Sequence, residues 1–294
     1  MALYNFGSLN IDHVYSLDHI VESGETQTAL NYETFVGGKG LNQSIAIARA
    51  GGHVIHIGAI GRGGSILKET LEEAGVDTSQ VMVKDSASGH AIIQVDKSGA
   101  NSIVIYGGSN QEIEKADIDR VFEDISTEDI VVLQNEISNV DYIVDKAHER
   151  NIKVSLNYSP ITDELKKIDL NKVTYLLVNE IEGLAAAQTD KIEDITKVLT
   201  TDYPNLNVIL TLGDKGAVFA RNGQEDVFQD AFKVEVVDTT GAGDTFTGYF
   251  LSAITENRPV QEALKIGSKA SSLAISRKGA SPSIPNRKEV EEQL

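Results

Sequence analysis

Short apolar runs rich in β-branched residues alternate with segments of helical period along most of the chain. This alternation is typical of a mainly parallel sheet with helices on both faces, so it predicts a three-layer α/β fold. The predicted strands are Tyr4–Ser8, Val54–Ala59, Ile130–Leu133, Lys153–Leu156, Tyr175–Val178 and Asn207–Leu212. The predicted helices are Gly40–Ala50, Ile66–Ala74, Val140–Arg150, Ile181–Ala187, Ile192–Thr200, Ala242–Thr255 and Pro259–Ser276.

Residues 89–106 depart from this alternation, because they contain two strand-like runs joined by a Gly/Asn turn with no helix between them. We expect them to join Asp12–Val21 and Glu33–Val36 in a small antiparallel sheet that projects from the main domain as a lid. The alternating apolar residues Ile103 and Ile105 fit either such a covering sheet or a strand in the core.

The length and composition suit one large α/β domain or two small ones, since 294 residues with 41% hydrophobic side chains suffice for a buried core. No repeat, low-complexity segment or flexible linker divides the chain. We therefore expect residues 1–294 to form a single domain, with a lid made by about residues 11–36 and 88–106.

The formal charge of −18, from 44 acidic and 26 basic residues, disfavours binding to nucleic acid or to an anionic membrane. It does not exclude a nucleotide, because backbone amides and one or two cations can bind phosphate inside a negative envelope. The sequence has no cysteine, no charged-then-apolar leader and no apolar run near the roughly 20 residues that span a bilayer. We expect a cytoplasmic enzyme or binding protein.

The run Asp-Thr-Thr-Gly-Ala-Gly-Asp at residues 238–244 is the most informative motif. The small residues Gly241, Ala242 and Gly243 permit close approach of backbone, and Asp244 stands at the start of a predicted helix. Amides that open a helix lack intrahelical partners and lie at the positive end of its dipole, so they can bind a phosphoryl group. An ionised Asp244 beside them can accept a proton from an attacking hydroxyl. The alternative is an ordinary Gly-rich turn.

A second Gly-rich run, Val-Gly-Gly-Lys-Gly-Leu-Asn, occupies residues 36–42 and precedes a predicted helix. Gly38 and its neighbouring glycines permit close approach of backbone, while Lys39 and Asn42 offer hydrogen-bond donors. A phosphate or a sugar can bind there, although a plain strand-to-helix turn has the same pattern.

Asn10 and Asp12 lie two residues apart at the end of the first predicted strand, so their side chains share a face. Ligands of open α/β sheets bind at the carboxyl ends of strands. An amide that donates and a carboxylate that accepts can together bind adjacent sugar hydroxyls. Asn and Asp are also common where a strand simply turns.

Polar groups follow other predicted strands as well. They include Asn135, Glu136 and Asn157. Asn179 and Glu182 lie three residues apart on one helical face, an arrangement that can hold Mg²⁺ through water, and its alternative is a helix cap formed by the asparagine. The loop at residues 211–216 can contact phosphates or a ribose, and a tight turn explains it nearly as well.

Several other chemistries lack their motifs. Neither Gly-rich run has the spacing of a Walker A loop or of a G-x-G-x-x-G fingerprint, which disfavours P-loop NTPases and Rossmann dehydrogenases. No H-E-x-x-H motif supports transition-metal catalysis. The absence of cysteine excludes thiol chemistry, and the absence of a G-x-S-x-G elbow disfavours an α/β-hydrolase.

Taken together, the two Gly-rich runs resemble the two signatures of the ribokinase-like (PfkB) carbohydrate kinase family. Residues 7–12, 179–182, 211–216 and 277–285 resemble the same family in order and spacing, so the likeness covers nearly the whole chain. It implies a three-layer α/β/α fold with a mainly parallel central sheet, a small antiparallel β lid and an ATP-dependent kinase activity on a sugar.

The resemblance also implies a role for each matching position. Asp244 would be the catalytic base, and the amides of Gly241, Ala242 and Gly243 would form an anion hole for the γ-phosphoryl group. The residues that would hold the sugar are Asn10, Asp12, Gly38, Lys39, Asn42, Glu136 and Asp244. Those that would contact ATP are Asn179, Thr211, Gly213, Gly216, Gly243 and Ser268, with Glu182 supporting Mg²⁺ through water. The positions that match a monovalent-cation site, usually for K⁺, are Asp238, Thr240, Ala274, Arg277, Gly279 and Ser283.

Two positions depart from the family pattern. Thr247 replaces an asparagine, and Tyr249 stands where the signature has a small residue. These changes can alter the packing behind the anion hole or reflect a substrate other than ribose. The lid varies most among sugar and nucleoside kinases, and because it forms the dimer contact in the family, the resemblance also implies a homodimer through the lid.

The favoured hypothesis is an ATP-dependent kinase that acts on a primary hydroxyl of a small sugar, converting D-ribose to ribose 5-phosphate, since the Asn10 and Asp12 pair suits a polyol. Another sugar or a nucleoside is the alternative substrate. A nucleoside kinase would line its lid with aromatic residues, and residues 89–106 offer only Tyr106. A non-catalytic sugar-binding regulator is a third reading, against which Asp244 argues.

Overall fold

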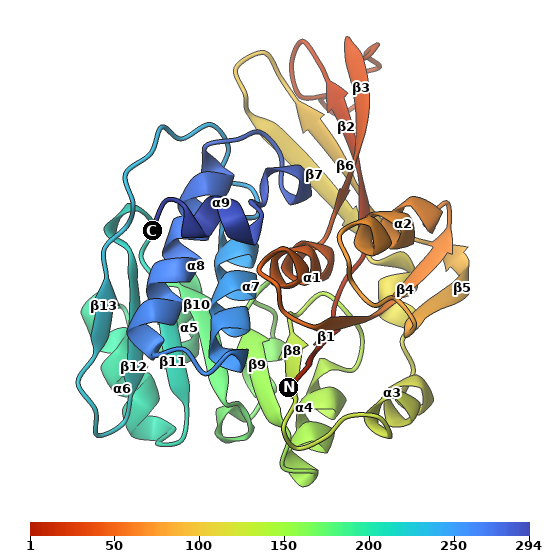
Figure 1. Ribbon diagram of the computed structural model, residues 1–294. Coiled ribbons are helices and arrows are strands. Elements are labelled where there is room, and N and C mark those ends of the chain that lie inside the picture. Colours follow the sequence, from red (N-terminus) through yellow and green to blue (C-terminus); the bar gives the residue numbers. More distant parts are fainter.

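A sheet of nine strands forms the centre of the computed structural model, which describes residues 1–294 (Figure 1). Its strands are β1 (Leu3–Phe6), β4 (Val54–Arg62), β5 (Val81–Ala87), β8 (Ile130–Leu133), β9 (Lys153–Asn157), β10 (Tyr175–Asn179), β11 (Asn207–Thr211), β12 (Ala217–Arg221) and β13 (Val227–Gln229). Their order is β13-β12-β11-β10-β9-β8-β1-β4-β5. Every pair from β5 to β11 is parallel, and only β12 and β13 run antiparallel to their neighbours.

Helices cover both faces of this sheet (Figure 1). They are α1 (Lys39–Arg49), α2 (Ser65–Glu73), α3 (Lys115–Phe122), α4 (Val140–Glu149), α5 (Glu180–Ala187), α6 (Ile195–Asp202), α7 (Ala242–Thr255), α8 (Val260–Ile275) and α9 (Arg287–Glu291). Helices α3 to α6 contribute to one apolar cluster of 33 buried residues, and the other helices contribute to a second cluster of 30. The two clusters lie on opposite faces of the sheet, so the predicted three-layer α/β/α architecture is confirmed.

A second sheet projects from the main body (Figure 1). Its strands are β2 (Asn10–Ser16), β3 (Asn31–Gly37), β6 (Gly89–Val95) and β7 (Asn101–Tyr106), in the order β3-β2-β6-β7. We call it the lid sheet. The outer pairs are antiparallel as expected, but β2 and β6 are parallel. The reason is that β2 follows β1 and β6 follows β5, and both of these strands run in one direction in the large sheet. Ile103 and Ile105 are exposed, so β7 is a covering strand and not a core strand.

Some elements differ from the expected ones. Strands β5, β12 and β13 and helices α3 and α9 are additional to the prediction; β5 carries Lys84, Asp85 and Ser86, which hide its strand pattern. The segment expected as one helix from Ile192 divides into a 3₁₀ turn and α6. Asn10 and Asp12 were expected at the end of the first strand, but they lie in β2 because the chain leaves the large sheet after Phe6. None of the helices is both long and apolar enough to cross a membrane.

Two glycines bring α1 and α7 into close contact. A Cβ atom on Gly40 would lie 2.4 Å from the carbonyl carbon of Gly7, so only glycine lets α1 begin directly against the end of β1. A Cβ atom on Gly248 would lie 2.4 Å from the Cβ of Ala46, which explains why α7 packs so closely on α1. These contacts place the first turns of α1 and α7 next to each other.

Candidate active site

The Asp244 side chain lies in the first turn of α7 and is only 7% exposed. Its carboxylate receives hydrogen bonds from two consecutive residues of α1. The Nδ2 atom of Asn42 donates to Oδ2 at 3.1 Å, and the Nε2 atom of Gln43 donates to Oδ1 at 3.0 Å. Each carboxylate oxygen thus has one fixed donor, which sets the plane of the carboxylate.

The start of α7 has the features of an anion-binding site. Gly241 is its N-cap, with φ 74°, a left-handed conformation that favours glycine, and no side chain caps the helix. A Cβ atom on Gly243 would meet no other atom within 4 Å, so the space beside this amide is open. The first amides of a helix have no intrahelical partner and lie at the positive end of the dipole, so they can bind a phosphoryl group there.

A cavity of about 230 Å³ joins this helix start to the carboxyl ends of β9, β10 and β11. Asn157, one of the polar residues expected at strand ends but given no role, also lines it, as does Leu177, which was not predicted. The predicted site residues in its lining are Lys39, Asn179, Glu182, Thr211, Gly241, Ala242, Gly243 and Asp244. The fold therefore brings both Gly-rich runs to one cleft.

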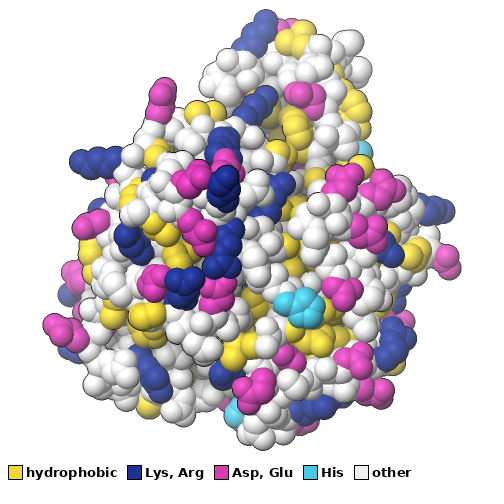
Figure 2. All heavy atoms as spheres, in the orientation of Figure 1, with side chains coloured by type: hydrophobic (Ala, Val, Ile, Leu, Met, Phe, Trp, Pro, Cys, Tyr) yellow, Lys and Arg dark blue, Asp and Glu magenta, His cyan; other side chains and the backbone are white.

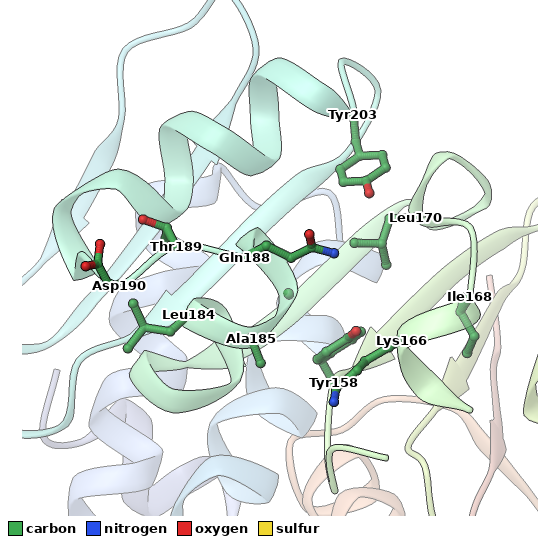
Figure 3. Close-up of a pocket in the computed structure, with 11 residues that line it drawn as sticks. Tyr158, Lys166, Ile168, Leu170, Leu184, Ala185, Gln188, Thr189, Asp190 and Tyr203 are labelled. Carbon is green, nitrogen blue, oxygen red and sulfur yellow. The ribbon is translucent and has the colours of Figure 1, made fainter. Parts of the chain in front are cut away.

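A larger pocket of about 710 Å³ contains none of the predicted residues (Figure 3). Figure 3 shows Tyr158 and Tyr203 among its lining residues. The lining comes from the chain after β9, from α5 and the turn after it, and from the end of α6. Its one lysine, Lys166, forms an ion pair with the exposed Asp163 at 3.0 Å. The chemistry of the motifs therefore belongs to the smaller cavity.

Asp12 lies beside Glu136 and close to the backbone of β3. A Cβ atom on Gly37 would lie 2.4 Å from Oδ2 of Asp12, so the glycine makes room for this carboxylate. Burial, and then the charge of Glu136, raise the pKa of Asp12 to about 6. Asp12 is consequently a carboxylate that changes charge near neutral pH.

Glu136 ties the start of α1 to β8. Its Oε2 atom accepts a hydrogen bond from the backbone amide of Lys39 at 3.0 Å and another from the hydroxyl of Ser8. Burial lowers the pKa of the Lys39 ammonium, but the nearby charges of Asp244, Glu136 and Glu182 outweigh that effect and raise it above its ordinary value. Lys39 therefore stays cationic between the carboxylates. Gly38 is the N-cap of α1, with φ 97°.

Asn10 has a partner that the sequence did not suggest. The Nδ2 atom of the buried Asn110 donates to Oδ1 of Asn10 at 2.8 Å, and it also donates to the carbonyl of Leu9. Asn110 comes from a 3₁₀ turn at Gly108–Glu112 that the sequence pattern does not mark. Because the Oδ1 atom of Asn10 accepts from Asn110, the Nδ2 atom of Asn10 is available to donate to a ligand.

Asn179 and Glu182 form a capping box at the start of α5, as the alternative reading of this pair predicts. Oδ1 of Asn179 accepts from the amide of Glu182 at 2.9 Å, and Oε2 of Glu182 accepts from the amide of Asn179 at 2.9 Å. The cap does not remove them from the cleft, because both line the cavity and the second carboxylate oxygen of Glu182 makes no hydrogen bond within the protein. One carboxylate oxygen beside a phosphate site is compatible with Mg²⁺ held through water.

Among the other predicted nucleotide contacts, Thr211 lines the cavity, whereas Gly213, Gly216 and Ser268 do not. The Thr211 hydroxyl at the end of β11 donates to the carbonyl of Val178 at 3.3 Å. Gly213 begins a 3₁₀ turn, and Gly216 ends it with φ 118°. Ser268 is nearly buried in α8, and it does not line the cavity.

The predicted cation positions come from two loops that meet. Oδ1 of Asp238 accepts from the amide and the hydroxyl of Thr240, and its Oδ2 accepts from the amide of Gly279 at 2.9 Å. The Arg277 side chain forms an ion pair with Glu289 at 2.7 Å. A guanidinium has no acceptor, so only the backbone carbonyl of Arg277 could bind a cation. Ala274 lies near the end of α8, and Ser283 in a 3₁₀ turn at Ser281–Ser283. No cluster of three or more His, Cys, Asp or Glu side chains suits a metal, so a cation here would be held mainly by carbonyl oxygens.

The two departures from the family pattern are both accommodated by packing. The Thr247 hydroxyl donates to the carbonyl of Gly243 at 2.8 Å, one turn back in α7. The Tyr249 ring is buried and its hydroxyl donates to the carbonyl of Pro285 at 2.6 Å, so it anchors the C-terminal segment. Thr247 lines the cavity and Tyr249 does not.

A buried carboxylate, helix amides that can bind an anion and further carboxylates that can accept from hydroxyls are the groups that phosphoryl transfer to an alcohol requires. Comparison with known proteins agrees. A family model described as pfkB family carbohydrate kinase matches residues 3–287, and the chain belongs to this family. The protein is therefore an ATP-dependent carbohydrate kinase, as the motifs predicted.

Individual relatives cover nearly the same length. The chain is 35% identical to ribokinase of Haemophilus influenzae, over 98% of this chain and 96% of that protein. Among solved structures, ribokinase from Cryptococcus neoformans in complex with ADP has a TM-score of 0.88 and 33% identity, covering 100% of this chain and 99% of that one. Ribokinase from Arabidopsis thaliana complexed with ribose and ATP has a TM-score of 0.87 and 30% identity, covering 99% and 98%.

The raised pKa of Asp12 leads to a pH prediction. As the pH falls through about 6, Asp12 of the free enzyme gains a proton and loses the acceptor capacity that its expected role in binding the sugar requires. We expect kcat/KM for the sugar to fall about tenfold per pH unit below that value. The measurement is a pH profile of kcat/KM for the wild type and for Asp12→Asn. The variant should be slower at neutral pH and lack this acid limb; an unchanged limb in the variant would show that another group causes it.

Proposed function

We propose that the protein transfers the γ-phosphoryl group of ATP to the primary hydroxyl of D-ribose, forming ribose 5-phosphate and ADP. The observation that carries the proposal is the buried Asp244, held by two donors of α1 at the amide end of α7. The relatives named above support ribose as the sugar.

In the proposed reaction Asp244 accepts the proton of the sugar hydroxyl while the oxygen of that hydroxyl forms a bond to the γ-phosphorus. The bond between that phosphorus and the bridging oxygen of ADP breaks, and ADP leaves with the bonding electrons. The amides of Gly241, Ala242 and Gly243 stabilise the negative charge on the transferred group. Protein groups thus supply position and electrostatics, which are the main contributions to phosphoryl transfer.

We propose that the sugar lies between the lid sheet and α1. Asp12 and Glu136 would accept from its hydroxyls, and Lys39 and Asn10 would donate. The Oδ1 atom of Asn42 supports this placement, because it is buried and has no hydrogen-bond partner in the protein. A buried acceptor without a partner is costly, and a ligand hydroxyl would satisfy it. Gly38 would let the backbone approach the sugar.

We propose that ATP occupies the cleft beside α7 and the carboxyl ends of the parallel strands. Its phosphates would lie at Gly243 and near Asn179, with Mg²⁺ held through water by Glu182, which keeps one carboxylate oxygen available. When bound, Mg²⁺ would offset phosphate charge. The residues proposed for the rest of the nucleotide are Thr211, Gly213, Gly216 and Ser268.

The positions of the aromatic side chains on the lid sheet help to decide between a sugar and a nucleoside as the substrate. Asp12 pairs with Phe35 across β2 and β3, so the two side chains share a face. Tyr106 pairs with His90, which pairs with Ile11, and the alternation of side chains places Tyr106 on the opposite face from Asp12. Phe35 is therefore the one aromatic residue of the lid sheet on the Asp12 face, which favours a sugar over a nucleoside.

The substrate prediction is checked by an ATP-consumption screen against D-ribose, 2-deoxyribose, other pentoses and hexoses, adenosine and pseudouridine. We expect the highest kcat/KM with D-ribose.

Asp244→Asn should lower kcat by at least about 10²-fold while largely sparing sugar binding, because the amide keeps the shape and loses the base. Turnover on none of these compounds would refute the ribose assignment, and a fully active Asp244→Asn variant would refute the base.

We propose that a monovalent cation, K⁺, orders the loop that carries the anion hole. Asp238 and Gly279 already join the two loops concerned, and the hydrogen bonds from Thr240 and Gly279 outweigh partial burial and hold the pKa of Asp238 below its ordinary value. Replacing K⁺ by choline at equal ionic strength should therefore lower kcat, measured as the initial rate at saturating ATP and ribose. A rate independent of the cation would contradict the proposed site.

We also propose a homodimer through the lid sheet. Strand β7 is an edge strand whose residues Ile103, Val104, Ile105 and Tyr106 are all more than half exposed, and Figure 2 shows hydrophobic side chains on the projecting lid. Apolar edge strands are normally covered. Light scattering should give twice the chain mass of 31.7 kDa. Ile105→Lys should yield monomers, and Val83→Lys, an equally exposed position on β5, should not; a monomeric wild type would rule the dimer out.

A further inference from the structure

A chain of buried polar side chains runs from the Asp244 carboxylate into the interior between α1 and the parallel sheet. Gln43 donates to Asp244, and the Nε2 atom of Gln134 donates to Oε1 of Gln43 at 2.8 Å. The same nitrogen donates to Oδ1 of Asn5 at 2.9 Å, and Asn5 donates to the carbonyl of Gly40 at 2.8 Å. Gln43, Gln134 and Asn5 are completely buried.

The hydrogen bonds among these buried side chains allow only one assignment of donors and acceptors. The Gly40 carbonyl can only accept, so the amide nitrogen of Asn5 must face it and the Asn5 oxygen must face Gln134. Gln134 therefore uses both hydrogens of its nitrogen as donors, one toward Asn5 and one toward Gln43. The Gln43 oxygen is then held by Gln134, and its nitrogen is directed at Asp244. A flipped Gln43 would place donor against donor on one side and oxygen against carboxylate on the other.

A branch of the network from Asn5 to Ser44 and His56 fixes the same orientation of the Asn5 amide. The second hydrogen of the Asn5 amide goes to the Ser44 hydroxyl at 2.8 Å, so the Ser44 proton is left for Nδ1 of His56, also at 2.8 Å. Burial lowers the pKa of His56 to about 3, so the ring stays neutral, and the tautomer that carries its proton on Nε2 leaves Nδ1 as the acceptor of the Ser44 hydroxyl. Asn5, Gln43, Ser44 and Gln134 have no group that titrates near neutral pH, so the donor direction among them does not change there.

We propose that Gln43 is a positioning residue for Asp244 and that Gln134 acts through it, holding the Gln43 amide so that its donor fixes the rotation of the base carboxylate. This inference rests on the proposed role of Asp244. With Oδ1 held by Gln43 and Oδ2 by Asn42, the carboxylate keeps one orientation toward the sugar hydroxyl. Both glutamines are completely buried, and their amide nitrogens donate within the network, so neither is expected to contact the sugar or ATP.

The test uses the full-length enzyme with the variants Gln43→Met, Gln134→Met and the double variant, since methionine keeps the volume and removes the donor. Gln43→Met should lower kcat by about tenfold or more, because small misplacements of a catalytic group are costly. The sugar Kd should change less than about threefold. Gln134→Met should lower kcat by a smaller factor. The double variant should be no slower than Gln43→Met, since Gln134 acts only through Gln43.

Ser252→Ala is the matched control, because it removes a buried hydroxyl bonded to the carbonyls of Gly248 and Ile47 at the same α1 and α7 contact. It should keep the wild-type kcat. Thermal unfolding of every variant separates lost folding from lost positioning. The positioning role is overturned if folded Gln43→Met keeps its kcat, if the losses appear in sugar Kd alone, or if the two single losses multiply in the double variant. An inactive Asp244→Asn with active glutamine variants would overturn this inference alone, whereas an active Asp244→Asn would overturn the proposed function.

Discussion

The contact between the first turn of α1 and the first turn of α7 is the constraint on which the rest of the site depends. It joins a helix near the amino end of the chain to one near its carboxyl end, through hydrogen bonds from Asn42 and Gln43 to Asp244. The contact is possible because glycine stands at positions 40 and 248, where a Cβ atom would clash with backbone or side chain. Backbone packing therefore sets the position of the base before any ligand binds.

The electrostatics of the cleft follow from this arrangement. The carboxylates of Glu136 after β8, Glu182 in α5 and Asp244 in α7 lie near the Lys39 ammonium and raise its pKa despite its burial. Such a site would repel a polyphosphate if the carboxylates acted alone. The amide end of α7 and the Lys39 charge supply the opposite sign where phosphate is proposed to bind, and the proposed Mg²⁺ would add to it. The protein can thus carry a strongly negative surface and still suit a nucleotide.

Much of the fold and part of the site could be predicted from local patterns. The strand and helix alternation indicated the parallel sheet, and Asp244 could be singled out because its glycines and its carboxylate are adjacent in sequence. The network behind it could not, since Gln43 and Gln134 lie 91 positions apart and look like ordinary polar residues of a helix and a strand end. Their role depends on burial and donor direction, which only the folded chain defines. Asn110, which orients Asn10 from 100 positions away, was missed for the same reason.

The most direct measurement of the central claim is the structure of a ternary complex with D-ribose and a non-hydrolysable ATP analogue. The account predicts that the primary hydroxyl oxygen of the sugar lies within hydrogen-bonding distance of an Asp244 carboxylate oxygen, with the γ-phosphoryl group at the amides of Gly241 to Asp244. A sugar whose primary hydroxyl lies elsewhere, or a γ-phosphoryl group remote from the start of α7, would contradict it.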